Sequence, residues 1–537
     1  MKRIYRILLS ILSGVLLSLA WLGFPGWVLF LGFLPLLYLN RYFSENQQTY
    51  RGVMFWGHAW LAFFVWNVLT TWWILNATPL GAALAIITNS FLMSLVWWLA
   101  HIARRYMRPN LANIALVVFW ISFEYFHYHW DIEWPWLNLG NGFANQIKMV
   151  QWFEFTGTLG GTLWVLIMNL LLFQLLTNYL NKTRLRSELV TLSGIVFLIA
   201  VPIIISVVIY NSYSETENPK NVVIVQPNIN PYSEQYDLKA ETEKMNVFLR
   251  LAALKTDDET DFVVGPETIF ENTSYWNEAN FDKSRFVDQL QSFNRRYHKT
   301  EMVFGVSSYV EYPDEEHATI TARRGKDMIY DVFNAAVFLG REEKSQVYHK
   351  SKLVVGVEKM PFKKYLGFMG DLVIDLGGTT NSYGRQKEPT NFTAADGTLI
   401  APVICYESVF GGYVTGYVQK GAQLIFIITN DGWWKNTPGY RQHLSFARLR
   451  AIETRRSIAR AANTGISCFI NQRGDVLQAT EWWTEATVQG TVNLNNKITF
   501  YVKYGDFIGR ISLFVAGLLF LYLISRFFMK DDYLYKK

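Results

Sequence analysis

Pro402-Val403-Ile404-Cys405-Tyr406-Glu407-Ser408 is the stretch that decides how the second half of this chain folds. An apolar run, Ile400 to Ile404, ends on a cysteine, and polar residues and two glycines follow. A strand that ends on a thiol can present a nucleophile, provided that a base and a cation lie nearby. The alternative for a lone cysteine is a small buried hydrophobe. The choice depends on whether the rest of the sequence supplies the partners.

Two residues elsewhere in the chain are candidates for these partners. Glu267 follows the apolar run Phe262 to Val264 and a Gly-Pro pair, and Lys350 lies between two apolar runs. Each alone is more often a solvated surface residue. A carboxylate alone would raise the pKa of a nearby thiol, whereas an ammonium offsets that effect. Together they indicate covalent acyl transfer, with Glu267 as general base, Cys405 as nucleophile and Lys350 stabilising the oxyanion.

The region around these residues alternates short β-branched runs with amphipathic stretches, which is typical of an α/β enzyme. Helices are predicted at Glu234 to Leu254 and at His443 to Ala461. Strands are predicted at Asn221–Val225, Phe262–Val264, Met302–Ser307, Ala335–Leu339, Ile400–Ile404, Leu424–Thr429 and Ile466–Asn471.

The overall composition hides two populations of residues. The 537 residues are 51% hydrophobic and 18% charged, yet the apolar residues concentrate in residues 1–212 and 506–529. A membrane-spanning helix needs about 20 mostly apolar residues. We therefore predict a seven-span membrane domain over residues 1–212, a catalytic domain over residues 213–505, and an eighth span with a tail over residues 506–537. The spans are predicted at Ile7–Trp21, Trp27–Leu39, Met54–Leu75, Pro79–Ala100, Leu111–Phe126, Leu159–Leu180, Leu189–Tyr210 and Phe507–Phe528.

The cations of the apolar part mark alternate loops. Cytoplasmic loops carry an excess of Lys and Arg, and these residues gather near the N-terminus, near residues 41–51, 104–108 and 182–186, and from residue 526 onward. The net charge of +6 is thus explained by topology, without a nucleic-acid partner. Both termini are predicted to be cytoplasmic and the catalytic domain extracytoplasmic. A cleavable signal peptide is the alternative for the first span. Its removal would leave an even number of spans before the catalytic domain, whereas an odd number is needed to place that domain outside the cytoplasm.

The soluble part resembles the nitrilase, or carbon-nitrogen hydrolase, superfamily, whose Glu-Lys-Cys triad lies on an α-β-β-α sandwich. The resemblance is carried by the stretches Gly265–Thr268, Tyr348–Lys350, Val403–Glu407, Thr429–Trp434 and Gln442–Glu453. With seven spans before it and one after, the chain resembles the apolipoprotein N-acyltransferase family over almost its whole length. Trp134 to Gly140 matches that family's segment before the sixth span.

The resemblance implies roles for further residues beside Glu267, Lys350 and Cys405. It makes Glu358 a second essential glutamate and Glu407 a supporting one, and it places Tyr406, Trp433 and Trp434 near the acyl site. The family usually has Pro-Phe-Gly-Glu where this chain has Val355-Gly356-Val357-Glu358. The geometry of this turn is therefore less well defined by the resemblance than the triad is.

The resemblance also implies a ping-pong reaction that needs no metal and no diffusible cofactor. Cys405 takes an acyl chain from a phospholipid as a thioester, and the α-amine of an N-terminal diacylglyceryl-cysteine on a lipoprotein then accepts it. The expected partners are phospholipid, diacylated apolipoproteins and the membrane. The expected location is the bacterial inner membrane, with the catalytic domain on the periplasmic side.

Several alternatives stay open at this stage. The same triad could serve a membrane-tethered amidase acting on a small extracytoplasmic amide, or the domain could be a degenerate receptor on a transporter or sensor. Cys405 and Cys468 could form a disulfide, although Cys468 is expected in a strand core. His127, His129 and Asp131 raise the question of a metal site, but an ordinary loop at the membrane–water interface is favoured. Lys359 to Met369 is either a lipid-admitting arm or a core-packing loop.

Overall fold

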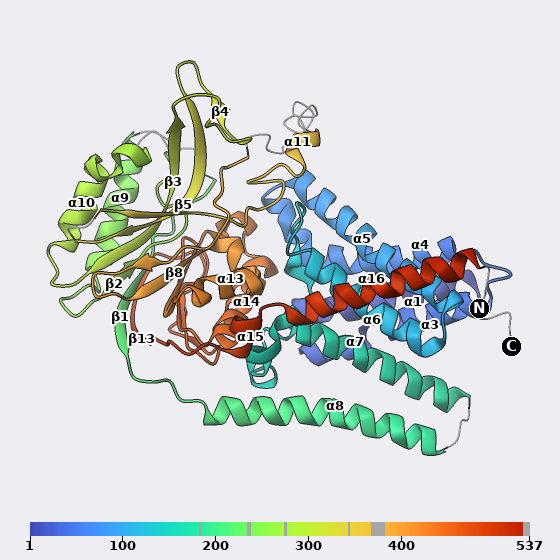
Figure 1. The fold of residues 1–537 in the computed structure, drawn as a ribbon. Helices are drawn as coiled ribbons and strands as arrows, with labels where there is room; N and C mark the ends of the chain where they lie inside the picture. Colours follow the sequence, from blue (N-terminus) through green and yellow to red (C-terminus); the bar gives the residue numbers. More distant parts are fainter. Residues whose placement is uncertain (182–184, 233–237, 273–275, 342–343, 367–381, 530–537) are drawn as a thin grey trace. The chain divides into compact units, whose positions relative to one another are not determined.

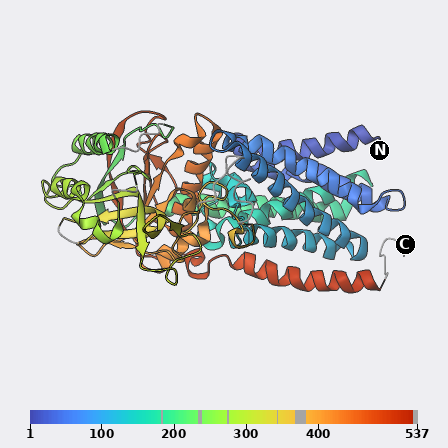
Figure 2. The ribbon, with the colours of Figure 1, turned by 90° about the horizontal axis from the view of Figure 1, so that it is seen from above.

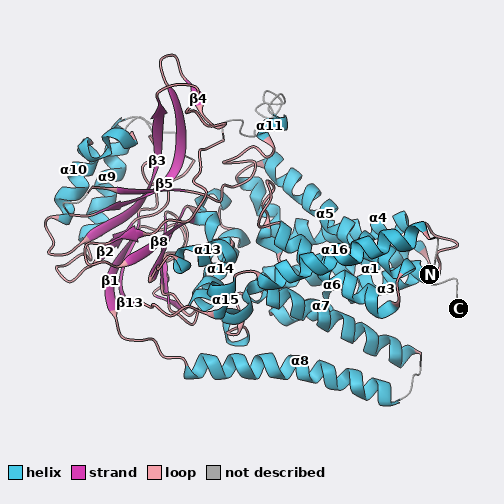
Figure 3. Cartoon of the chain, in the orientation of Figure 1, coloured by secondary structure: helices cyan, strands magenta, loops and turns pink. Residues whose placement is uncertain are grey.

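The structure is a computed structural model of the chain, and it describes residues 1–181, 185–232, 238–272, 276–341, 344–366 and 382–529. These residues form two compact units. The first comprises residues 1–73, 82–212 and the chain from residue 504 onward, and the second comprises residues 74–81 and 213–503. The first unit is helical, whereas every strand that the structure describes belongs to the second (Figure 3).

The first unit contains seven helical segments that are long and apolar enough to cross a membrane, counted over the described residues. They run largely alongside one another (Figure 2). The chain is therefore a membrane protein. Its long helices are α1 (Arg3–Ser18), α3 (Leu34–Glu45), α4 (Gly52–Thr71), α5 (Pro79–Tyr106), α6 (Pro109–Phe126), α7 (Phe153–Leu180), α8 (Leu185–Ser212) and α16 (Phe507–Phe528).

The predicted second span is not one continuous helix, so the predicted count of eight is not confirmed. The segment is divided into a 3-10 turn, the short α2 (Leu29–Gly32) and α3, with the break at Phe33. Pro35 explains the break, since it has no N–H and its ring would clash with the carbonyl four residues earlier. Asn169 of α7 bridges the gap: its side chain accepts from the Phe33 N–H at 2.9 Å and donates to the Leu29 carbonyl at 2.8 Å.

The segment Trp134 to Gly140 folds into short 3-10 turns that are tied to α6. The Glu124 carboxylate accepts the Leu139 N–H at 2.9 Å, the Trp120 indole N–H at 2.9 Å and the Thr162 hydroxyl at 2.6 Å. Because its acceptors are occupied by three donors, this buried acid stabilises the turn.

The second unit contains two β-sheets. The first has the strand order β13-β1-β2-β3-β5-β4, with β6 paired to β5, and the second has the order β12-β11-β10-β9-β8-β7. Neighbours β1, β2 and β3 are parallel, as are β8, β9 and β10. The first sheet comprises β1 (Pro219–Gln226), β2 (Phe262–Val264), β3 (Glu301–Tyr312), β4 (Arg323–Arg324), β5 (Ile329–Leu339), β6 (Gln346–His349) and β13 (Ala486–Asn493). The second comprises β7 (Phe392–Thr393), β8 (Leu399–Ile404), β9 (Leu424–Thr429), β10 (Ile458–Ala462), β11 (Cys468–Ile470) and β12 (Val476–Leu477).

The two sheets pack face to face and are covered by helices on their outer faces (Figure 1). Between them Phe262 of β2 meets Phe426 of β9 edge to face, with ring centroids 5.5 Å apart. Helices α9 (Leu238–Ala253) and α10 (Arg285–Asn294) cover the first sheet, and α13 (Gly411–Gln419) and α14 (Pro438–Thr454) cover the second. The predicted α-β-β-α sandwich is confirmed.

One predicted helix extends too far. The prediction ran from His443 to Ala461, but α14 ends at Thr454, and Ile458 to Ala462 form β10 in the second sheet. Arg455 ends the helix in the left-handed region, with φ of 51°. The alanine-rich sequence of β10 favours a helix locally, but parallel pairing with β9 outweighs that preference.

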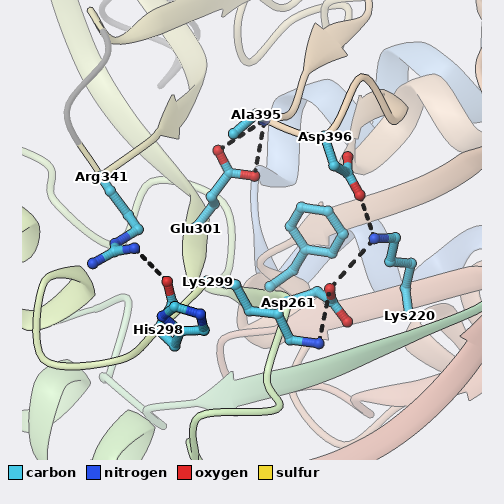
Figure 4. A pocket seen from close by; sticks show the side chains of 9 residues that line it. Lys220, Asp261, His298, Lys299, Glu301, Arg341, Ala395 and Asp396 are labelled. Carbon is cyan, nitrogen blue, oxygen red and sulfur yellow. Dashed lines mark hydrogen bonds and ion pairs between the residues drawn. The ribbon is translucent and has the colours of Figure 1, made fainter.

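A cavity of about 630 Å³ lies at the amino ends of β1, β2 and β3 (Figure 4). Lys220 pairs there with Asp261 at 3.4 Å and with Asp396, and the Glu301 carboxylate accepts the Ala395 N–H at 3.2 Å. Residues 395 and 396 lie in the turn before β8, so these contacts join the two sheets. The cavity is at the opposite end of β8 from Cys405, and most of its charges are paired with one another.

Candidate active site

Three strand ends bring the predicted triad together. Glu267 lies shortly after β2, Lys350 directly after β6 and Cys405 directly after β8. All three side chains are buried, with exposed fractions of 6%, 1% and 7%. The cluster is therefore assembled from both sheets: Glu267 and Lys350 follow strands of the first sheet, and Cys405 follows a strand of the second.

The Lys350 ammonium is held between two carboxylates. Its Nζ donates to Glu267 Oε1 at 2.9 Å and to Glu358 Oε1 at 2.8 Å. Glu358 is kept in place by its second oxygen, which accepts the Val354 N–H at 2.7 Å. Gly356, at φ of 82°, closes the turn before it, so the departure from the usual Pro-Phe-Gly-Glu pattern still leaves the carboxylate on Lys350.

Asn334 is a member of this cluster that the sequence prediction missed. From the middle of β5, its Nδ2 donates to Glu267 Oε1 at 2.8 Å and to Glu358 Oε1 at 2.9 Å. The other Glu267 oxygen accepts the Asn430 N–H at 3.0 Å. The available signal was a single amide in the apolar run Val332 to Leu339, because a buried polar side chain needs a partner.

The charges at the site oppose one another. Burial lowers the pKa of Lys350, but the carboxylates of Glu267 and Glu358 outweigh it, so the pKa of the ammonium lies well above its usual value. Burial raises the pKa of the Cys405 thiol, Glu267 raises it further and Lys350 offsets only part of this, so it lies well above its usual value. The resting site thus holds a neutral thiol beside a carboxylate able to take its proton.

The backbone at Cys405 is strained and is held by hydrogen bonds. Its φ of 47° lies in the left-handed region, which disfavours side chains larger than glycine. The Ser408 hydroxyl donates to the Cys405 carbonyl at 2.7 Å, and Nε2 of His443 lies 3.1 Å from the same oxygen. These contacts fix the turn that carries the thiol.

The second ring nitrogen of His443 contacts Asp431, which is itself in a buried ion pair with Arg460. Nδ1 of His443 lies 3.0 Å from Asp431 Oδ1, and Arg460 of β10 donates to Asp431 Oδ2 at 2.7 Å. Although burial raises the pKa of the Asp431 carboxyl, the charges of Arg460 and His443 outweigh it and hold that pKa below its usual range. Asp431 and His443 lie in stretches that sequence analysis matched to the superfamily, but their contact could not be read from their spacing.

Glu407 connects the cysteine turn to the chain after Lys350. One oxygen accepts the Tyr348 hydroxyl and the Ser351 N–H, each at 2.7 Å, and the other accepts the Ile404 N–H at 2.9 Å. The side chain is fully buried, and burial raises the pKa of its carboxyl to about 7. With both oxygens occupied, Glu407 positions the two loops and is not placed to act as the base.

Models of two known protein families match the two parts of this chain. The family model described as carbon-nitrogen hydrolase matches residues 221–498, which is more than half of the chain. The chain belongs to the carbon-nitrogen hydrolase family. A second model, the apolipoprotein N-acyltransferase N-terminal domain, matches residues 13–171.

Relatives of this carbon-nitrogen hydrolase match it over nearly its whole length. An apolipoprotein N-acyltransferase of Chlorobaculum tepidum is 27% identical, over 95% of each chain. Another from Geobacter metallireducens is 25% identical, over 93% of this chain and 91% of that one. A third, from Thermotoga maritima, is 23% identical, over 96% of this chain and 93% of its own.

The aromatic residues predicted to bind substrate differ in their surroundings. Tyr406 is buried, and its ring meets Phe410 edge to face at 5.1 Å. Trp433 is 39% exposed and lies 5.5 Å from the ring of Tyr232, whereas Trp434 packs edge to face on His443 at 5.5 Å. Trp433 alone of the predicted three exposes a large apolar surface.

The remaining sequence predictions concern residues away from the triad. Cys405 and Cys468 are both free thiols, and Cys468 is fully buried in β11, where burial raises its pKa to about 12. Nδ1 of His129 lies 2.9 Å from the Tyr125 carbonyl. Across the described ranges, no three His, Cys, Asp or Glu side chains are grouped to hold a metal ion.

The predicted lipid-admitting arm is only partly described. Lys363 to Leu366 form the short helix α11. Tyr365 is 71% exposed, which suits either a lipid contact or a solvated loop. Residues 367–369, including Phe368, lie outside the described residues, so the hypothesis stays a prediction.

Proposed function

We propose that this chain is an apolipoprotein N-acyltransferase that carries an acyl chain on Cys405 from a phospholipid to the N-terminal amine of a diacylated lipoprotein. Membership in the carbon-nitrogen hydrolase family, relatives that match end to end and seven membrane-spanning segments support the assignment. The observation that carries the mechanism is the Lys350 ammonium on the Glu267 carboxylate beside the buried thiol. A membrane-tethered amidase is not favoured, because these relatives are acyltransferases.

In the first half-reaction Glu267 takes the proton of Cys405 as Sγ attacks the ester carbonyl carbon of the donor. The C–S bond forms, and the carbonyl electron pair moves to oxygen, where the Lys350 ammonium stabilises the negative charge. Collapse of this intermediate breaks the C–O bond, and the departing glycerol oxygen takes the proton from Glu267. The products are a thioester on Cys405 and a lysophospholipid.

In the second half-reaction the lipoprotein amine attacks the thioester carbonyl. Glu267 accepts a proton from the nitrogen, the C–S bond breaks, and the sulfur recovers its proton. A neutral resting thiol suits this cycle, since proton transfer accompanies each attack and no buried thiolate has to persist. We place the protein in the bacterial inner membrane, with residues 213–505 on the periplasmic side.

Intact-protein mass spectrometry tests the thioester. The full-length enzyme in detergent is mixed with phospholipid, and the wild type is compared with Cys405→Ala and with the matched control Cys468→Ala. We expect an acyl adduct on the wild type and on Cys468→Ala but not on Cys405→Ala, and a diacylglyceryl peptide should discharge it. An adduct that persists on Cys405→Ala, or peptide acylation by that variant, would contradict the mechanism.

A further inference from the structure

Two cations beside the site have no ionic partner. Within the described ranges, neither Arg323 of β4 nor Lys363 of α11 makes an ion pair, and Nε of Arg323 is buried without a hydrogen bond. Both side chains are only partly exposed. A cation that is partly removed from water without a partner is unfavourable unless an anion binds to it.

Tyr383 connects these cations to the catalytic cluster. The guanidinium of Arg323 lies over the Tyr383 ring, 5.8 Å from its centroid. The Tyr383 N–H donates to the Glu358 carbonyl at 2.9 Å, and Glu358 holds Lys350. Tyr383 thus lies between Arg323 and Glu358, the glutamate that holds Lys350.

Lys363 joins Arg323 from another segment of the second unit. It lies five residues after Glu358, and its ammonium is close enough to feel the charges of Asp331, Arg323 and Arg324. Figure 1 shows β4 and α11 on the same side of the unit. The two cations therefore come from separate segments and lie within electrostatic reach of each other and of Asp331.

The charge balance of this group suits one negative charge. Arg324 is neutralised by Glu315, with two N–O distances of 2.8 Å. The Asp331 carboxylate accepts hydrogen bonds from the hydroxyls of Tyr312 and Thr319, and its negative charge balances one of the two cations. The remaining charge of about +1 matches a phosphodiester monoanion, which arginine and lysine bind through charge-assisted hydrogen bonds.

We infer that Arg323, which lies over the Tyr383 ring, and the neighbouring Lys363 bind the phosphodiester of the lipid that donates the acyl chain. The inference rests on the proposed acyl transfer from phospholipid and assigns the headgroup contact to these residues. In a phospholipid the glycerol backbone separates the phosphate from the acyl ester. In the protein, Tyr383 and Glu358 lie between Arg323 and Lys350, so the cation that would bind the phosphate is likewise separated from the lysine at the reacting ester.

The test compares two acyl donors of equal chain length in detergent micelles. Phosphatidylglycerol carries the phosphodiester, whereas a neutral p-nitrophenyl ester does not, and both load Cys405. The full-length Arg323→Gln and Lys363→Gln variants are compared with Arg324→Gln, a matched control whose cation is already paired and exposed. The readout is kcat/KM for acyl-enzyme formation with each donor.

We expect Arg323→Gln and Lys363→Gln each to lower the ratio of kcat/KM for phosphatidylglycerol to that for the ester by about tenfold or more, the effect of losing one charge-assisted hydrogen bond. Arg324→Gln should change this ratio by less than about twofold. An equal loss with both donors, or no larger loss than in Arg324→Gln, would overturn the assignment. Failure of the wild type to load Cys405 from phosphatidylglycerol, while the ester still loads it, would instead contradict the proposed function.

Inorganic phosphate distinguishes a lipid headgroup from a free anion. It is added to the ester assay, where no lipid phosphate competes. We expect no effect below millimolar concentrations. A change in wild-type turnover that Arg323→Gln abolishes, with phosphatidylglycerol turnover intact in that variant, would assign the cations to free phosphate and overturn the headgroup inference.

Discussion

Each end of the sandwich holds a lysine between two carboxylates, but the two clusters differ in their exposure to water. At the catalytic end Lys350 is 1% exposed between Glu267 and Glu358. At the opposite end the Lys220 side chain is 15% exposed, and its partner Asp396 is 46% exposed. Asp396 of the Lys220 cluster is therefore open to water, whereas no side chain of the Lys350 cluster is more than 11% exposed.

The difference in exposure determines what each cluster can do. Exposed ion pairs are screened by water and contribute little to stability. Buried charges interact strongly, but removing one leaves the others without compensation. The cluster around Lys220 can thus join the sheets with little effect on folding stability if one charge is lost. Burying the charges around Lys350 lowers folding stability, but their strong interactions suit the stabilisation of charge during a reaction.

The largest predicted effect comes from removing the buried cation, Lys350, and comparing the result with removal of Lys220. Lys350→Met should lower kcat for acyl transfer by about 10²–10³-fold or more, because the oxyanion loses its cation. Lys220→Met should keep kcat within about twofold and reduce stability by about 1 kcal/mol at most. Acyl-enzyme formation and thermal unfolding of both variants measure the two effects. Equal losses of activity would show that exposure does not separate the two clusters.

A smaller effect is expected from the amide that bridges the two buried carboxylates. Asn334→Ala removes one donor from both Glu267 and Glu358, and we expect kcat to fall by about 10–100-fold, as for a lost hydrogen bond to a charged group. Asn294→Ala is the matched control, since this buried amide of the same unit donates to the Leu339 carbonyl. The control should lose stability without a selective loss of kcat; a similar loss of kcat in both variants would contradict the role of Asn334.

The smallest effect concerns the pH dependence of stability. The Glu407 carboxyl has a pKa of about 7 in the folded protein against 4.5 for an ordinary glutamate. The folded state therefore binds more protons between these values, and its stability should fall as pH rises from about 4.5 to about 7. Glu407→Gln should flatten this slope in chemical denaturation, although it lowers stability at every pH.

Glu301→Gln, near Lys220 at the opposite end of the sandwich, is the control for this slope. It removes a buried glutamate that accepts the Ala395 N–H but leaves Glu407 in place. It should keep the decline between about pH 4.5 and 7. A decline that persists unchanged in Glu407→Gln would show that another group causes it.

Features that depend on local pattern were predictable from the sequence. β2 and β9 have the predicted bounds, and Glu267, Lys350 and Cys405, each singled out because it adjoins an apolar run, lie together in one buried cluster. Contacts between distant segments were not predictable. Asn334 carries no local sign of the two glutamates it binds, and the contact of Arg460 with Asp431 depends on β10, which was predicted as helix. Exposure, which separates Lys350 from Lys220, also arises only when the sheets pack.

The pairing of β13 with β1 has a consequence for biosynthesis. β1 begins at Pro219, but its antiparallel neighbour ends at Asn493, so the first sheet keeps an open edge until nearly all of the domain has been synthesised. Only a short stretch then separates β13 from α16, which begins at Phe507. A nascent chain that lacks β13 therefore leaves one edge of β1 unpaired, and the first sheet is completed only after residue 493 has been synthesised.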